Sequence, residues 1–302
     1  MPITSQNEAI AIVKLAAAVT PAPIVGSPVL GLVTRDYQKT EAQAGDAVDI
    51  AVPLIAQGGG VTHFPPNRRI VLNTHAEATF QIPDVRKILA FPPLMAAYMS
   101  PAMIAIVEKI EEDLMSLYTN FTANTAVGSS GTITEAVIDS AEASLLSANV
   151  SPHDQKYLVV NAATYDAMRL LRRFEEFQTA RWKTGGQGST NGILEPNMAG
   201  ECPIGANGKF KNFLVLRSHF IQKPWTTTYN MAFHRDALGL AIRRPPSLMT
   251  GAIAEYAETG DFGVRIVLSW DPNSLAQQLT VACLYGCAVI RDSFGIQVQS
   301  NN

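Results

Sequence analysis

Two tripeptides in the C-terminal third contain the residue types that protein kinases use to transfer a phosphoryl group. His234-Arg235-Asp236 has the form of the catalytic loop, whose aspartate accepts the proton of the attacking hydroxyl. Asp261-Phe262-Gly263 has the form of the segment that binds Mg²⁺. A kinase also needs an asparagine five residues after the catalytic aspartate, and this position is Ala241. The triple glycine at 58–60 lacks the spacing of a phosphate-binding loop, so the sequence excludes a kinase.

Both tripeptides are therefore interpreted as structural segments. We expect residues 234–236 to form a polar turn between strands, in which Arg235 and Asp236 pair locally or across a subunit boundary. The glycine-rich stretch 184–192 lacks the lysine of a nucleotide-binding loop and is predicted to bind or move rather than to hold phosphate. A small-molecule enzyme that uses this stretch as a lid is an alternative, and it would show turnover by a discrete soluble oligomer.

The remaining reactive side chains predict no catalytic, cofactor or metal site. The five histidines have no i,i+4 spacing for a metal on a helix, and no serine lies in a G-x-S-x-G context. Cys202, Cys283 and Cys287 are odd in number and lack zinc-site spacing, so they are predicted to be reduced thiols. We therefore expect a protein that is not an enzyme.

A basic and aromatic cluster at 169–183 has two interpretations. It could form a platform for nucleic acid, because arginines alternate with aromatic residues. Glu175 and Glu176 interrupt the cluster, so we favour a solvated helix end with salt bridges between subunits, and we assign Arg172 and Arg173 to such contacts.

Composition favours a protein whose surface faces other protein. Only 16% of residues are charged and 47% are hydrophobic, against about 25% charged in an average soluble chain. The net charge of −3 offers no electrostatic footprint for nucleic acid or an anionic membrane, so nearby DNA would be enclosed rather than gripped. No apolar run is long enough to span a membrane.

The elements that would position these residues follow from hydrophobic periodicity. Residues 1–45 are predicted to be an extended arm, because three prolines interrupt "TPAPIVGSPVLG". An alternating run places Val48, Ile50 and Val52 on one face, and a second run continues to residue 82 with Ile70, Leu72 and Phe80 on one face. The pair predicts a long hairpin that projects from the body and needs cover from another copy of the chain. A hairpin folded back onto its own sheet is the alternative.

After the hairpin, the sequence predicts one long helix, an α/β layer and a series of strands. Ser100 and Pro101 form a helix start, and an apolar stripe follows for about 21 residues. Thr134 is expected to cap a second helix, and Asn161 a third helix that follows the buried strand 156–160. From Asn212 onward the chain alternates as strands, so the fold class is α+β.

Several stretches resemble the major capsid proteins of tailed bacteriophages, which have the Hong Kong 97 fold. "GDAVDIAVP" and "VLNTHAEATFQIPDVRKILA" resemble the two strands of that family's projecting E-loop. "YLVVNAATYDAMRLL" is similar to the start of its axial domain, "MAFHRDALGLAIRRP" to the return from that domain, and "LTVACLYGCAVIRDSFGIQVQ" to its closing strands. Their order along nearly the whole chain is more specific than any single stretch.

The resemblance implies a fold with an arm at 1–45, an E-loop at 46–82, a peripheral domain with the spine helix at 83–150, an axial domain at 151–239, and peripheral closing strands at 240–302. It implies a coat protein that assembles into pentamers and hexamers of an icosahedral shell around double-stranded DNA. A cellular nanocompartment shell of the same fold is the alternative.

The resemblance also implies partners and a location. The chain would contact itself, a portal, possible decoration proteins, and packaged DNA without sequence specificity, in a virion assembled in the host cytoplasm. Because the sequence begins directly with the arm, a separate scaffolding protein is expected. We assign inter-subunit contacts to Val48, Ile50, Val52, Arg68, Arg69, Ile70, Leu72, Phe80, Arg172, Arg173, Arg235 and Asp236.

Covalent cross-linking between subunits is not expected. Some members of the family join subunits through a lysine of the E-loop, but residues 46–82 contain no lysine. Denaturing gel electrophoresis of mature particles should therefore show a single band near 32.5 kDa. A ladder of covalent multimers would contradict this prediction.

Overall fold

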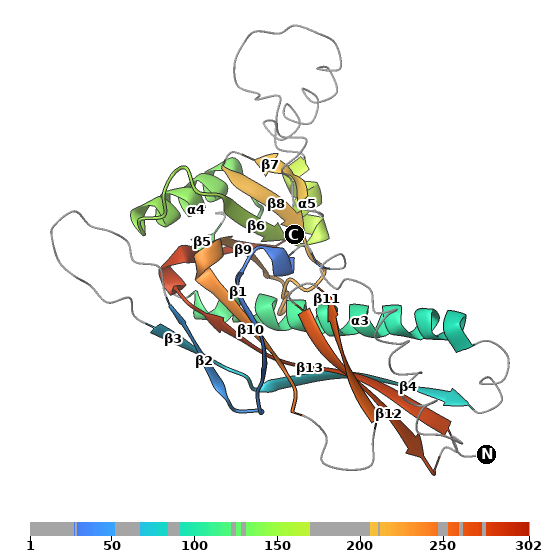
Figure 1. The fold of residues 1–302 in the computed structure, drawn as a ribbon. Helices are drawn as coiled ribbons and strands as arrows, with labels where there is room; N and C mark the ends of the chain where they lie inside the picture. The colour runs from blue at the N-terminus through green and yellow to red at the C-terminus, as the bar shows by residue number, and fades with distance from the viewer. Residues whose placement is uncertain are drawn as a thin grey trace, which may run out of the picture.

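In a computed structural model, the described residues of the chain form two six-stranded sheets, a two-stranded ribbon and a long helix, together with shorter helices (Figure 1). The structure describes residues 27, 29–51, 67–83, 91–121, 125–127, 131–169, 206–210, 212–246, 253–259, 262–273 and 276–301. None of the helices within these ranges is long and apolar enough to cross a membrane.

The first sheet is organised around β13 (Ala276–Val289). One edge of β13 pairs with β12 (Phe262–Asp271) and then with β10 (Leu238–Arg244), while its other edge pairs with β4 (Thr74–Pro83), all antiparallel. The sheet ends with β11 (Ile253–Thr259) beside β12 and β1 (Thr34–Glu41) beside β10. The predicted closing strands are confirmed where they form β12 and β13.

The long helix α3 (Phe91–Ser116) contacts β4 and β13 and continues into the 3₁₀ turn η3 (Leu117–Asn120). It begins nine residues before the predicted start, and Pro101 lies inside it. Proline removes one backbone hydrogen bond, but burial outweighs that loss. The predicted apolar stripe is confirmed, since its buried members include Met103, Ile106, Val107, Ile110, Leu114 and Phe121.

The second sheet has the order β5 (Thr125–Val127), β14 (Gly295–Ser300), β9 (Thr228–His234), β6 (Lys156–Val160), β8 (Phe213–Arg217) and β7 (Ala206–Phe210). Helix α4 (Glu135–Ser147) contacts β5 and β14. Helix α5 (Ala162–Arg169) follows β6, and its predicted cap is confirmed because Asn161 Oδ1 accepts the Thr164 N–H at 2.7 Å.

Three segments lie in parts of the fold that differ from those predicted from the sequence. Residues 34–41, predicted as part of the arm, form β1 and pair in parallel with β10. The last strand, β14, belongs to the second sheet rather than to the closing strands of the first. Helix α4 also lies with the second sheet, outside the predicted range 151–239. Strand pairing is nonlocal, so periodicity alone did not reveal these partners.

The predicted long hairpin is also wrong in its second half. Strands β2 (Ala47–Ala51) and β3 (Asn67–Val71) do form an antiparallel ribbon, with Val48 opposite Ile70. The second run is interrupted at residues 72–73, and β4 then pairs with β13 as a strand of the body. Residues 74–83 lie in the sheet because β13 offers a second free edge with ten matching backbone positions.

The ribbon approaches the first sheet at two glycines, Gly239 of β10 and Gly286 of β13. A Cβ atom on Gly286 would overlap the carbonyl oxygen of Val71, and one on Gly239 would lie 2.7 Å from Ile290 Cδ1 and 2.8 Å from Ile70 Cδ1. Backbone atoms move aside less readily than the ends of side chains, so glycine is more strictly required at position 286 than at position 239.

We therefore expect Gly286→Ala to lower the free energy of unfolding of the unassembled subunit by about 1–3 kcal/mol, because β3 must shift away from β13. Urea unfolding measures this difference. Gly263→Ala is the matched control, since a Cβ there meets nothing within 4 Å, and its effect should stay within about 0.5 kcal/mol. Equal effects of the two substitutions would show that the close approach is unimportant.

Candidate assembly surfaces

The apolar face of the ribbon is covered by its own chain. Ile50, Ile70 and Leu72 form a small core with three residues of the first sheet and its following turn, Ala241, Leu284 and Ile290. Ile70 and Leu72 are completely buried, and Ile50 is 9% exposed. The prediction that these three residues contact a neighbouring subunit is therefore corrected, because the first sheet already covers them.

The outer face of the ribbon carries the polar residues. Arg68 and Arg69 are exposed, and Arg69 Nε lies 3.2 Å from Asp49 Oδ1 across the ribbon. Such an exposed ion pair contributes little to stability, so both arginines are available to another protein. Val71 is 45% exposed nearby. The assignment of Arg68 and Arg69 to subunit contacts stays a prediction.

The other predicted contact residues lie in varied places. Val48 is partly buried against the small ribbon core, and Phe80 is partly buried against the main core. Val52, Arg172 and Arg173 lie outside the described residues, as do the glycine-rich stretch 184–192 and Cys202.

The residues that spell a kinase catalytic loop form a turn between the two sheets. Residues 235–237 are a 3₁₀ turn, η4, that joins β9 of the second sheet to β10 of the first. The Asp236 N–H donates to His234 Nδ1 at 3.3 Å, and Thr34 Oγ1 donates to Asp236 Oδ1 at 3.4 Å. Asp236 thus pairs locally, as predicted, and ties β1 to the turn. Phe262 and Gly263, the two described residues of the second tripeptide, lie in β12 and pair with β11.

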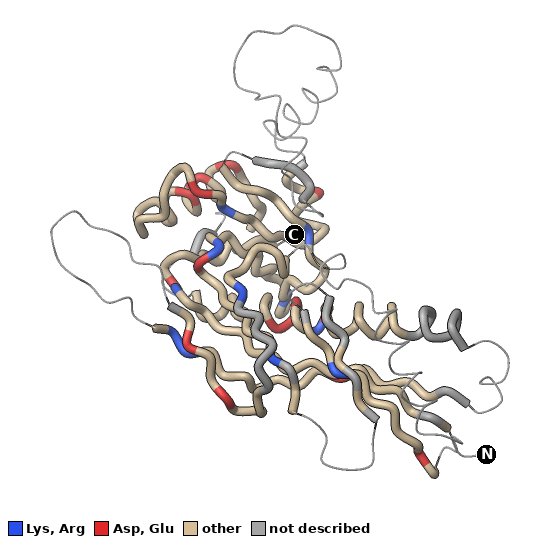
Figure 2. The backbone as a smooth tube through the Cα atoms, viewed as in Figure 1, with Lys and Arg blue, Asp and Glu red and all other residues tan. Residues whose placement is uncertain are grey.

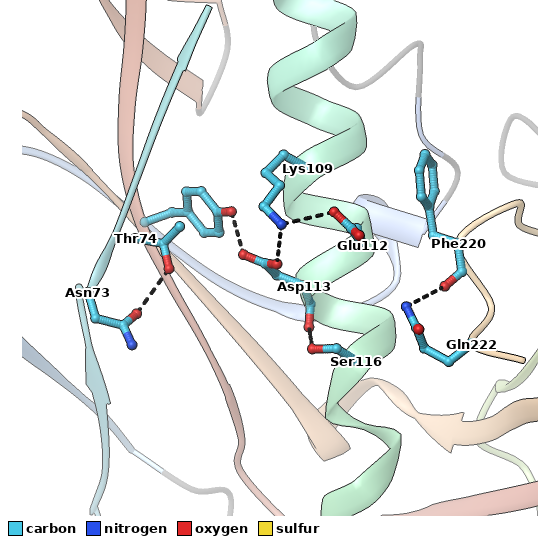
Figure 3. A network of polar contacts seen from close by, with 9 residues as sticks. Asn73, Thr74, Lys109, Glu112, Asp113, Ser116, Phe220 and Gln222 are labelled. Carbon is cyan, nitrogen blue, oxygen red and sulfur yellow. Dashed lines mark hydrogen bonds and ion pairs between the residues drawn. The ribbon is translucent and has the colours of Figure 1, made fainter. Parts of the chain in front are cut away.

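One side of α3 is tied to the first sheet by a polar contact. The Tyr285 hydroxyl, on a fully buried side chain of β13, donates to Asp113 Oδ2 at 2.6 Å (Figure 3). Lys109 Nζ lies 3.1 Å from Asp113 Oδ1 and 2.9 Å from Glu112 Oε2. The hydrogen bonds to Glu112 and Asp113 raise the pKa of Lys109. Burial, with the Asp113 carboxylate beside it, raises the pKa of Tyr285.

The opposite side of α3 is tied to the second sheet. Ser218, which follows β8, donates its hydroxyl to the buried carboxylate of Glu111. The same hydroxyl accepts the Phe220 N–H at 3.2 Å, and the Ser218 N–H donates to the Val160 carbonyl of β6 at 3.0 Å. Residues two apart on a helix point to opposite sides, so Glu111 and Asp113 join α3 to different sheets. The burial of Glu111 has no signal in the sequence, because glutamate is almost always exposed.

Comparison with known proteins identifies this arrangement. No protein-family model and no curated protein matches the sequence. Among solved structures, an encapsulin complex, holo-SrpI from Synechococcus elongatus, is 12% identical with a TM-score of 0.56, covering 89% of this chain and 85% of that one. The capsid of Ralstonia phage GP4 is 13% identical with a TM-score of 0.54, covering 93% and 88%. A virus-like particle from Pyrococcus furiosus is 10% identical with a TM-score of 0.52, covering 94% and 97%.

The chain has the Hong Kong 97 fold. Helix α3 lies in the range predicted for the spine helix, and the β2–β3 ribbon lies in the range predicted for the E-loop. The assignment of the first sheet to a peripheral domain and of the second sheet to an axial domain stays a prediction. The polar contacts of Asp113 and Glu111 join α3 to both sheets.

The described part of the Hong Kong 97 fold contains no group of three or more residues able to hold a metal ion. The two described cysteines, Cys283 and Cys287, are thiols of low reactivity. Burial raises the pKa of Cys283 to about 12 and raises the pKa of Cys287 as well. Both are free thiols held protonated at neutral pH, which fits the prediction of reduced cysteines.

The bond between Tyr285 and the spine helix gives a test. Tyr285→Phe should lower the free energy of unfolding of the unassembled subunit by about 1–2 kcal/mol, because a hydrogen bond to a carboxylate is lost. Lys109→Met is the control, since it removes the exposed partner of the same carboxylate and should cost less than about 0.5 kcal/mol.

The same bond predicts a pH dependence. The pKa of Tyr285 is raised in the folded chain, so its stabilisation is complete below the usual tyrosine pKa of about 10 and is lost as the pH rises above it. Urea unfolding at pH 9 and pH 11 should show a smaller loss of stability in Tyr285→Phe than in the wild type. An equal loss in both would contradict the assignment.

Proposed function

We propose that this chain is the major capsid protein of a tailed phage. Copies assemble into pentamers and hexamers, and these close into an icosahedral shell around double-stranded DNA. The observation that carries the proposal is the likeness in fold to shell-forming proteins over most of both chains, the phage GP4 capsid among them. The proposed function is geometric and requires no catalytic site or cofactor.

The distribution of charge supports enclosure of DNA rather than specific binding. Lys and Arg positions are interspersed with Asp and Glu positions along the described chain (Figure 2), and the net charge of the sequence is −3. A protein that grips DNA neutralises phosphates with a basic surface, and its binding weakens steeply with salt. A closed shell instead retains DNA by confinement, without sequence specificity.

The proposed partners follow from this role. The chain contacts further copies of itself, a scaffolding protein during assembly, a portal through which DNA enters, and possible decoration proteins. Its location is the virion, after assembly in the host cytoplasm. Each contact between copies is weak, so a misplaced copy can dissociate. The summed free energy of many such contacts stabilises the closed shell.

A nanocompartment shell that encloses a protein cargo is the second candidate. The likeness to the SrpI encapsulin complex, with a TM-score of 0.56, favours it as directly as GP4 favours a phage shell. The two candidates share the fold and the assembly, and they differ in what the particle contains.

Electron microscopy and absorbance together test the proposal. Particles isolated from a lysate of the producing cells should be closed and icosahedral. After nuclease treatment they should retain double-stranded DNA, seen as an absorbance maximum near that of nucleic acid. A protein-like spectrum with a co-purified enzyme would instead support the nanocompartment. A compact monomer that forms no particles at any concentration would contradict both.

A further inference from the structure

The most exposed large hydrophobic side chain in the described part of the chain is Trp225. It is 97% exposed, whereas the next in order, Trp270 and Ile104, are each 46% exposed. Trp225 lies in the turn that joins β8 to β9 of the second sheet. Its backbone has φ 64, in the left-handed region that bulky residues rarely adopt.

The turn that displays Trp225 is held at its base. The Tyr229 N–H donates to the Gln222 carbonyl at 3.0 Å. Gln222 Nε2 donates to the Phe220 carbonyl at 3.4 Å (Figure 3). Thr227 Oγ1 donates to Asn301 Oδ1 at 3.4 Å, so the last described residue also supports the turn. Pro224 restricts the backbone just before the tryptophan. The indole is therefore presented from a constrained turn.

Two features of Trp225 are unfavourable in the isolated subunit: its strained backbone and its solvent-exposed indole. A non-glycine residue in the left-handed region is strained, and such strain persists where the surrounding structure and function require it. A solvent-exposed indole also gains no free energy from burial of its large apolar area. Burial of that area is why tryptophan is enriched among interface hot spots. A residue with both features fits a pocket on another molecule.

We propose that Trp225 anchors a contact between neighbouring copies of this chain in the assembled shell. This inference rests on the proposed function. In a shell built from one protein, the neighbours of each copy are further copies, so the surface that receives the indole belongs to this chain. The turn at 222–227 contains a single cation, Lys223, which is too little charge for a nucleic-acid platform.

The substitution Trp225→Gly separates anchoring from folding. Glycine adopts φ 64 without strain, so the turn and the subunit should unfold at the same or a higher urea concentration. Loss of the anchor should raise the protein concentration at which particles form by about 30-fold or more, measured by light scattering. Trp270→Ala is the control for loss of an exposed tryptophan from another element. Assembly of Trp225→Gly at the wild-type concentration would overturn the inference.

Fluorescence then reports directly on the indole. The double variant Trp182→Phe/Trp270→Phe leaves Trp225 as the sole tryptophan of the chain, which has three. On assembly into empty particles, its emission should shift to shorter wavelength and acrylamide should quench it less. Equal quenching in subunits and particles would overturn this inference but not the proposed function. Protection of the indole from acrylamide in DNA-filled particles only would do the same. Failure of the wild type to form any particle would overturn the proposed function together with this inference.

Discussion

The packing of helix α3 is the constraint on which the rest of the structure depends. Its apolar stripe packs into the main core, while Asp113 on one side bonds to Tyr285 of the first sheet and Glu111 on the other bonds to Ser218, which follows strand β8 of the second sheet. Apolar packing alone is non-directional and tolerates sliding. Two polar contacts on opposite sides fix both the rotation and the position of the helix, so the two sheets keep one relative orientation.

The β2–β3 ribbon shows how the same chain limits a feature that would otherwise promote aggregation. A two-stranded ribbon with an apolar face is marginal in water and prone to pair with other chains. Ile70 and Leu72 are buried on the first sheet, and the glycines at 239 and 286 let the backbones approach closely enough for that burial. The exposed side of the ribbon is left with Arg68 and Arg69.

The tripeptides that resemble kinase signatures illustrate why residue types must be placed before chemistry is assigned. His234 and Asp236 bond to each other at a crossing between sheets, and Thr34 of an edge strand completes the turn. Their polar groups are used to hold backbone and neighbouring strands together. The same residue types in an active site would instead face a substrate.

The sequence by itself determined which faces are buried, because helical and strand periodicity are local properties of the chain. The stripe from Met103 to Leu114, the buried strand at 156–160 and the Asn161 cap were all predictable in this way. Only the tertiary structure decided what covers each face. The ribbon face at Ile70, the pairing of β1 with β10 and the burial of Glu111 depend on residues more than a hundred positions away. Periodicity carries no information about such partners, since any surface of matching shape and polarity can satisfy the same local pattern.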